Sequence, residues 1–212
     1  MKVKPEIKSY VEADVLPRYT YFDKAHQPDH IETVIHQSAA LAEMLHGQGV
    51  EVDRDMVYVI AAYHDLGIVN GRENHHIDSG KILMADPVLP QFFTEAQRLT
   101  MKEAVEDHRA SAKSAPRSIY GRIVAEADRQ IDPRTVVVRA LQYGLEHYPE
   151  LDKAGHLARA EAHLKEKYGE GGYLKLWFPE SENARKLAEL RRLIADREAL
   201  HALMEDVWGH CS

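Results

Sequence analysis

Histidine is the unusual residue of this 212-residue chain, which contains thirteen of them. His64 follows apolar residues by three, four and seven positions, and His108 and Asp128 follow apolar residues in closely similar patterns. His30 begins a comparable apolar stripe. Residues with these separations lie on one face of a helix. We therefore expect four polar side chains to point towards the core, each from near a helix end.

A shared divalent cation would make the burial of these side chains tolerable. A buried ionised group without a partner destabilises a fold by roughly several kcal/mol. Asp65 and Asp128 could each be matched by an arginine, but few arginines lie on the predicted apolar stripes. Imidazole and carboxylate ligands suit Zn, Mn, Fe or Co. The single cysteine, Cys211, argues against a structural zinc site built from thiolates.

The adjacent residues His64 and Asp65 are informative because neighbouring side chains on a helix normally diverge. A helix that ends here, opened by Gly67, would let both side chains turn towards one ion. The doublet therefore predicts a metal-binding helix terminus.

The elements that carry these residues are predicted to be helical nearly throughout, with no convincing β-alternation. Asp29 is a candidate cap for the first helix, with Gly47 and Gly49 ending it, and Asp53 or Asp55 begins the next, which ends at His64. The remaining predicted helices span residues 79–85, 94–108, about 118 to before 133, 135–147, 151–167 and 183–207.

The order His30, His64-Asp65, Asp128 resembles the H…HD…D signature of the HD superfamily of metal-dependent phosphohydrolases. The stretches AAYHDLG and IVAEADRQIDP resemble the local contexts of that signature. His76, which precedes Ile-Asp-Ser-Gly, and His108, in AVEDHRAS, resemble the additional ligands of the two-metal branch. The resemblance covers about residues 25–135, and its ordered agreement at six positions is specific.

The resemblance implies an all-α fold: an HD-domain helical bundle with additional C-terminal helices. The expected organisation is one HD-type domain over residues 1–212, with the motif-bearing core at about 25–135 and a helical extension at about 136–212. The implied cofactor is one or two divalent transition-metal ions (Fe, Mn, Co, Zn or Ni, with Mg as a further option). The implied ligands of the first ion are His30, His64, Asp65 and Asp128.

A second ion would be held by His76 and His108 and bridged to the first by Asp65. His75 is an alternative to His76, which is favoured for its spacing to Gly80. A site with one metal, lacking His76 and His108, also stays open. His64 and Asp65 are the implied catalytic residues of the metal centre.

A basic segment follows His108 directly. Arg109, Lys113, Arg117 and Arg122 occur there without an acidic residue between them. Arg109, Lys113 and Arg117 are therefore candidates for binding a substrate phosphate, and Arg109 and Lys113 are also candidates for a catalytic role. A solvated basic loop is the alternative.

The composition of the chain limits the classes of partner that it is expected to bind. The chain is 44% hydrophobic and 29% charged, which is typical of a globular protein, and its net charge of −7 argues against non-specific nucleic-acid binding. The longest apolar run, Met56 to Tyr63, is too short to cross a membrane. These features, with the single cysteine, predict a cytoplasmic protein that acts on small molecules; the oligomeric state is left open.

The expected activity is hydrolysis of a small nucleotide or related phosphorylated metabolite, as a phosphomonoesterase or phosphodiesterase, by metal-activated water. The GYP element of the cyclic-di-GMP phosphodiesterase branch is absent, which disfavours that substrate. Two alternatives are an HD-type di-iron oxygenase acting on a small polyol or phosphonate, and a non-catalytic nucleotide sensor. The basic segment after His108 favours phosphate chemistry.

Overall fold

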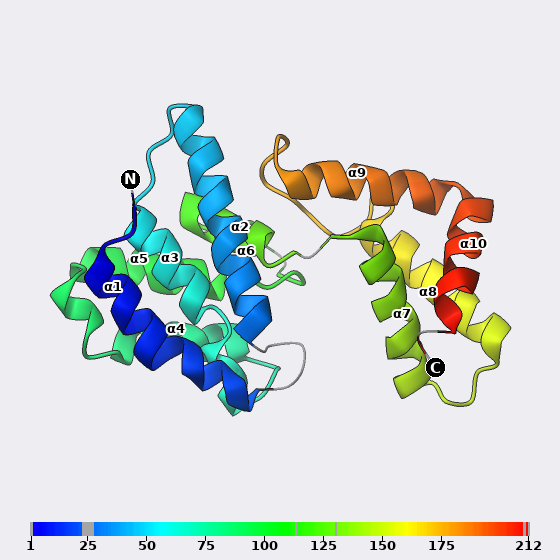
Figure 1. Ribbon diagram of the computed structural model, residues 1–212, viewed down its shortest axis with the longest axis horizontal. Coiled ribbons are helices and arrows are strands. Elements are labelled where there is room, and N and C mark those ends of the chain that lie inside the picture. Colours follow the sequence, from blue (N-terminus) through cyan, green and yellow to red (C-terminus); the bar gives the residue numbers. More distant parts are fainter. Residues whose placement is uncertain (1, 23–27, 113, 130, 210, 212) are drawn as a thin grey trace. The chain divides into compact units, whose positions relative to one another are not determined.

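The computed structural model describes residues 2–22, 28–112, 114–129, 131–209 and 211 (Figure 1). Within these residues the fold is all-helical, with ten α-helices and no β-strand. The predicted fold class is therefore confirmed. The chain divides into two compact units, residues 1–129 and 130–212.

The first unit begins with a helical segment that lies outside the predicted helices. Helix α1 (Pro5–Tyr10) continues into a π-helical turn (Val11–Val15) and a 3₁₀ helix (Leu16–Tyr21). Its fully buried residues recur every four positions: Ile7, Val11, Val15 and Tyr19. The Tyr19 hydroxyl donates a 2.8 Å hydrogen bond to the backbone carbonyl of Ala62, so this segment braces the helix that leads to His64.

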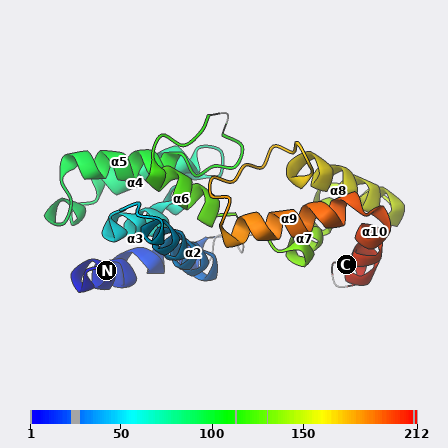
Figure 2. The ribbon, with the colours of Figure 1, turned by 90° about the horizontal axis from the view of Figure 1, so that it is seen from above.

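Three helices form the centre of the first unit (Figures 1 and 2). They are α2 (Pro28–Gly47), α3 (Arg54–Tyr63) and α6 (Ile119–Ala127). Helix α2 packs against both others. The Asp53 side chain caps α3 by accepting hydrogen bonds from two backbone N–H groups, as the sequence predicts.

Two further helices complete the first unit, α4 (His75–Ala85) and α5 (Glu95–Glu106), and they pack against each other. Thr94 and Gln97 form a capping box at the start of α5. Helix α4 begins four residues before the helix expected at 79–85. The extra turn matters because it includes both candidate ligands, His75 and His76.

A short 3₁₀ helix, η4 (Leu66–Asn70), follows the His64-Asp65 doublet and packs on α4. Gly67 permits this close approach: a Cβ there would collide with the carbonyl oxygen of His75 and lie 2.5 Å from the backbone nitrogen of Ser79. The Gly67 N–H donates to the Ser79 hydroxyl at 2.8 Å.

The second unit contains α7 (Pro133–His147), α8 (Lys153–Tyr168), α9 (Glu182–Ala195) and α10 (Arg197–Trp208), packed around their own apolar core. The prediction of one continuous helix over 183–207 is wrong. Asp196 has an extended backbone with ψ of 95°, and its side chain caps α10 by accepting from the Ala199 N–H. The apolar stripe hides this break because both helices bury residues in one core.

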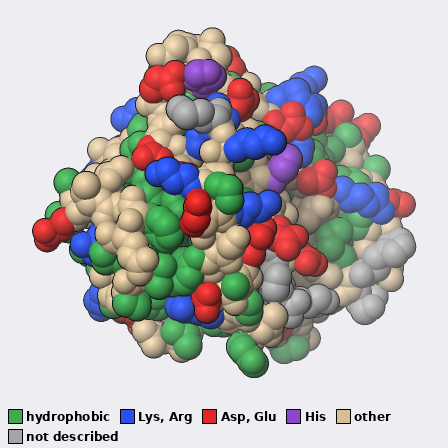
Figure 3. Space-filling model, turned by 60° about the vertical axis from the view of Figure 1, so that its left-hand side comes forward, with side chains coloured by type: hydrophobic (Ala, Val, Ile, Leu, Met, Phe, Trp, Pro, Cys, Tyr) green, Lys and Arg blue, Asp and Glu red, His purple; other side chains and the backbone are tan. Residues whose placement is uncertain are grey.

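The boundary between the units lies close to the expected start of the helical extension at about residue 136. That residues 1–212 form a single domain stays a prediction. No helix in the described part of the chain is long and apolar enough to cross a membrane. On the face drawn in Figure 3, acidic and basic side chains are interspersed.

Replacing Gly67 with alanine should destabilise the protein by about 1–3 kcal/mol, because η4 and α4 would have to separate to admit a methyl group. Gly47→Ala is the matched control, since a Cβ there meets nothing within 4 Å. We expect that variant to be neutral or slightly stabilised. Urea unfolding followed by circular dichroism measures both, and equal stability of the two variants would contradict the packing role of Gly67.

Candidate metal centre

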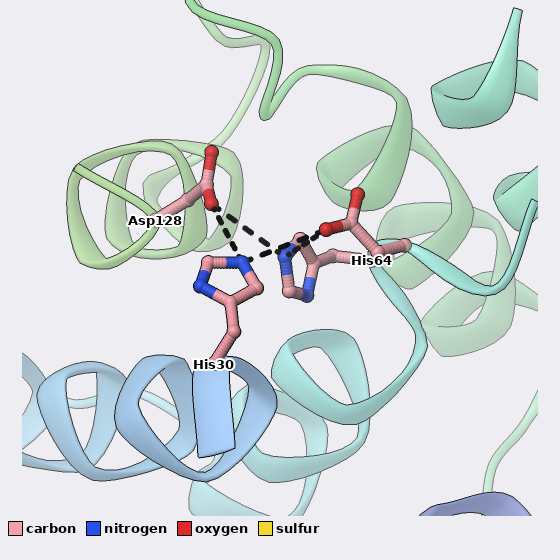
Figure 4. A group of neighbouring side chains, drawn as sticks. His30, His64 and Asp128 are labelled. Carbon is pink, nitrogen blue, oxygen red and sulfur yellow. Dashed lines mark ion pairs between the residues drawn. The ribbon is translucent and has the colours of Figure 1, made fainter. Parts of the chain in front are cut away.

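Three side chains from three helices converge on one point (Figure 4). His30 lies in the first turn of α2, while His64 and Asp128 are the C-cap residues of α3 and α6. The Nε2 atom of His30 lies 3.2 Å from Oδ1 of Asp128, and that of His64 lies 3.7 Å from the same oxygen. His64 is fully buried.

Asp65 presents its two carboxylate oxygens to two different sets of histidines. Its Oδ2 atom lies 3.1 Å from Nε2 of His64 and 3.6 Å from Nε2 of His30. Its Oδ1 atom lies 3.4 Å from Nε2 of His108 and 3.5 Å from Nε2 of His75. This is the arrangement expected of a carboxylate shared between two adjacent cation sites.

Backbone carbonyls fix the tautomers of three of these histidines. The Nδ1 atoms of His64, His75 and His108 lie 2.8, 2.8 and 2.6 Å from the carbonyl oxygen three residues earlier. A carbonyl can only accept, so each Nδ1 carries the proton and donates it. In the neutral ring, Nε2 is then left with a lone pair, which is the form that binds a metal.

The lone pairs of His75 and His108 face each other. Their Nε2 atoms are 3.1 Å apart, a distance that is repulsive for two neutral rings of this tautomer unless a proton or a cation lies near both. Burial lowers the pKa of His75, which disfavours the protonated ring. A cation between the two rings would resolve this conflict. Nε2 of His64 is buried and faces the carboxylates of Asp65 and Asp128, which raise the pKa of that ring against the effect of burial, so this nitrogen carries either a proton or a metal ion.

The carboxylates in the cluster are held ionised. Burial by itself would raise the pKa of Asp65, but the charge of His64 and the hydrogen bonds of the surrounding histidines hold it well below its usual range. The pKa of Asp128 is likewise lowered, against the effect of burial, by His30 and His64. Both side chains can therefore serve as anionic ligands.

The donor atoms fit one or two divalent ions. Ligand atoms of His30, His64, Asp65 and Asp128 all lie within 4.8 Å of one another, and so do those of Asp65, His75 and His108. Nitrogen and carboxylate oxygen donors of this kind suit Zn, Mn, Fe, Co or Ni. Five of the six residues expected as ligands are thus brought together.

The structure differs from the sequence expectation at the sixth position, where His75 and not His76 faces the cluster. Adjacent residues on a helix point about 100° apart, so α4 can direct one of the pair inward. The bond from His75 to the Arg72 carbonyl holds that ring towards His108. His76 instead lines a neighbouring cavity with Arg109. The spacing to Gly80 was therefore misleading.

The predicted basic residues have different positions. Arg117 forms ion pairs with Glu106 and Asp107, at 2.8 and 2.9 Å, and these raise its pKa. These ion pairs join the loop between α5 and α6 to the end of α5. Because the guanidinium is already paired with two carboxylates, it is poorly suited to the predicted phosphate contact. Arg109 donates a 2.8 Å hydrogen bond to the Glu73 carbonyl and lies at the cavity beside the cluster. Lys113 lies outside the described residues.

Arg129 is a site residue that sequence reasoning missed. Its Nη1 donates to Oδ2 of Asp128 at 3.0 Å and its Nη2 to the His108 carbonyl at 2.9 Å. It therefore orients Asp128 from behind and leaves Oδ1 facing His30 and His64. Its position directly after Asp128 was visible in the sequence, but neighbouring residues on a continuing helix would diverge.

Residues 29–130 match the family model described as "HD domain". The match spans the four elements that carry His30, His64-Asp65, His108 and Asp128. This segment is therefore an HD domain, and its histidines and aspartates form a cluster consistent with a metal site. Comparisons with curated proteins and with solved structures found no match to the chain.

The choice between the adjacent histidines can be tested by metal content. His75→Ala should lose one equivalent of bound Mn²⁺ or Co²⁺, because it removes an Nε2 donor from the group around Asp65. His76→Ala should retain full occupancy, since its ring lies outside both groups. Inductively coupled plasma mass spectrometry after dialysis against each metal measures the ratio. Loss of metal from the His76 variant alone would reverse the assignment.

Proposed function

We propose that this protein is a metal-dependent phosphohydrolase acting on a small phosphorylated metabolite, with a nucleotide as the favoured class. HD domains are associated with hydrolysis of this kind, and the cluster within residues 29–130 contains the ligand atoms it needs. The observation that carries the proposal is the shared carboxylate of Asp65, with one oxygen directed to each set of histidines.

Each residue of the cluster has a defined task in this proposal. His30, His64, Asp65 and Asp128 would hold one ion, and Asp65, His75 and His108 would hold a second. Bound ions would lower the pKa of water and neutralise charge on a phosphoryl group. Arg129 keeps Asp128 ionised and fixed by occupying its outer oxygen.

The neighbouring cavity supports a phosphate-bearing substrate. It has a volume of about 480 Å³, and its lining includes His76, Arg109, Ser111 and Ser114 as well as the paired side chains of Arg117, Glu106 and Asp107. Hydroxyl and guanidinium donors of this kind bind phosphate oxygens. Arg109 is the preferred contact, since its hydrogen bond to Glu73 holds it beside the first turn of α4. Lys113 stays a candidate for the same role on the sequence alone.

His64→Ala and Asp65→Ala should abolish metal-dependent phosphate release, lowering kcat/KM by roughly three orders of magnitude or more, which equals about 4 kcal/mol of transition-state stabilisation. The variants remove ligands of the site, so their metal content should fall while helical circular dichroism is retained. Phosphate release from a panel of nucleotides and sugar phosphates, with Mn²⁺, Co²⁺, Mg²⁺ or Fe²⁺, provides the measurement.

His46→Ala is the matched control because His46 lies in the same unit, is exposed, pairs with Glu51, and belongs to neither group of metal-ligand candidates. Its activity should equal that of the unaltered protein. Full hydrolysis by a metal-free His64 variant would disprove the proposal. Oxygen uptake with iron, without phosphate release, would instead identify an oxygenase, and tight nucleotide binding without turnover a sensor.

A further inference from the structure

A second cavity lies within the unit formed by residues 130–212, between α7 and α8. Its volume is about 630 Å³, which is within the range of small-molecule sites. Val136, Ala140 and Ala162 contribute apolar wall. None of its described lining residues belongs to either group of metal-ligand candidates. This α7–α8 pocket is therefore separate from the metal centre.

The lining of the α7–α8 pocket is cationic. Among the described residues that line it, Arg139, Arg159 and Lys167 are positively charged and Glu166 is negatively charged. His163 also lines it, and burial lowers the pKa of that ring, which favours its neutral form. The whole chain has a net charge of −7, so this local excess of positive charge is opposite in sign to that of the protein. Such a lining favours an anion.

Arg159, one of the lining residues, is fixed in place by its contacts. Its Nη2 donates to the carbonyl oxygen of Ala140, and the guanidinium carbon lies 5.5 Å from the Tyr143 ring and 5.4 Å from the Tyr148 ring. A Cβ on Gly144 would lie 2.9 Å from Nε, so this glycine provides the space that the guanidinium occupies. An arginine held in this way loses little side-chain entropy when it binds a ligand.

Arg159 also has unused hydrogen-bonding capacity. Its Nε–H is buried and has no acceptor among the described residues. A buried donor without a partner destabilises a protein by about 1–3 kcal/mol. The described residues therefore do not satisfy all of the donors of Arg159.

Two tyrosines give the α7–α8 pocket an aromatic side. Tyr143 and Tyr148 line the cavity and are 50% and 39% exposed. Tyr143 already stacks on His147, with ring centroids 4.0 Å apart and an angle of 11° between the rings. Exposed aromatic rings beside fixed cations can contact both the flat part and the charged part of one ligand.

We propose that the α7–α8 pocket binds a small anion that carries a flat ring, of the size and charge of a nucleoside monophosphate. Arg139 and Arg159 contact the anionic group, and Tyr143 and Tyr148 pack against the ring. Apolar residues of α7 and α8 form the wall behind it. The site needs no metal ion, because its positive charge comes from side chains.

Isothermal titration calorimetry of the 212-residue chain with AMP in EDTA tests the proposal, while chelation removes divalent ions from the metal centre. AMP should bind more tightly than adenosine or inorganic phosphate, since adenosine and phosphate each make only part of the contacts that AMP makes. Arg139→Gln should weaken AMP binding roughly tenfold through loss of a charge-assisted contact. Tyr148→Ala should weaken AMP and adenosine but leave phosphate unchanged.

Arg134→Gln is the matched control. It lies on the same helix, is exposed, and pairs with Asp206 at 2.7 Å outside the cavity lining, so it removes the same charge without touching the α7–α8 pocket. Equal effects of the two arginine variants, or no AMP binding up to millimolar concentration, would overturn the proposal.

Photo-crosslinking with 8-azido-AMP locates the ligand directly. The label should appear in peptides from residues 136–168, and labelling confined to residues 1–129 would contradict the site. The His64→Ala protein should bind AMP in EDTA as the unaltered protein does. That result separates failure of the metal-dependent hydrolase proposal from failure of this one.

Discussion

The first unit is organised around imidazole lone pairs and carboxylates that face one another in a buried space. His64 and Asp65 are buried, and the Nε2 atoms of His75 and His108 lie 3.1 Å apart. Without a cation or a proton between them, these two nitrogens set lone pair against lone pair. Hydrophobic packing cannot compensate such a conflict locally, because each polar atom needs its own partner. The ends of α2, α3, α5 and α6 thus bring together donor atoms that are consistent with a bound cation.

Helix ends can orient the candidate metal ligands because some of their backbone groups lack intrahelical partners. The carbonyls of the last turn of a helix are left without donors. His64 and His108 each follow the end of a helix, and each donates from Nδ1 to one of these carbonyls. One hydrogen bond thereby caps the helix and orients the metal-binding nitrogen. Asp128 is less favourable at the negative end of α6, and Arg129 and the facing histidines offset that charge.

The sequence was most informative where side-chain type and helix periodicity agree. The helical class, the start of a helix at Asp53 or Asp55, and the convergence of His30, His64 and Asp128 all followed from short-range patterns. The choice of His75 over His76 depends on the rotation of α4, which its packing against η4 and α5 determines. The partners of Arg117 arise from a loop that returns to α5, and no local pattern encodes that return.

Net charge acts differently at the two proposed sites. A chain with a charge of −7 weakly repels anions at long range, but charges separated by more than about 8 Å are largely screened at physiological ionic strength. Anion binding therefore depends on cations within the site itself. In the metal centre Asp65 and Asp128 are ionised, and bound divalent ions would add the positive charge that offsets these carboxylates. In the α7–α8 pocket, Arg139, Arg159 and Lys167 supply positive charge permanently. Chelation should thus abolish anion binding at the metal centre and leave binding at the α7–α8 pocket unchanged. The same anion can therefore be used to measure the two sites separately.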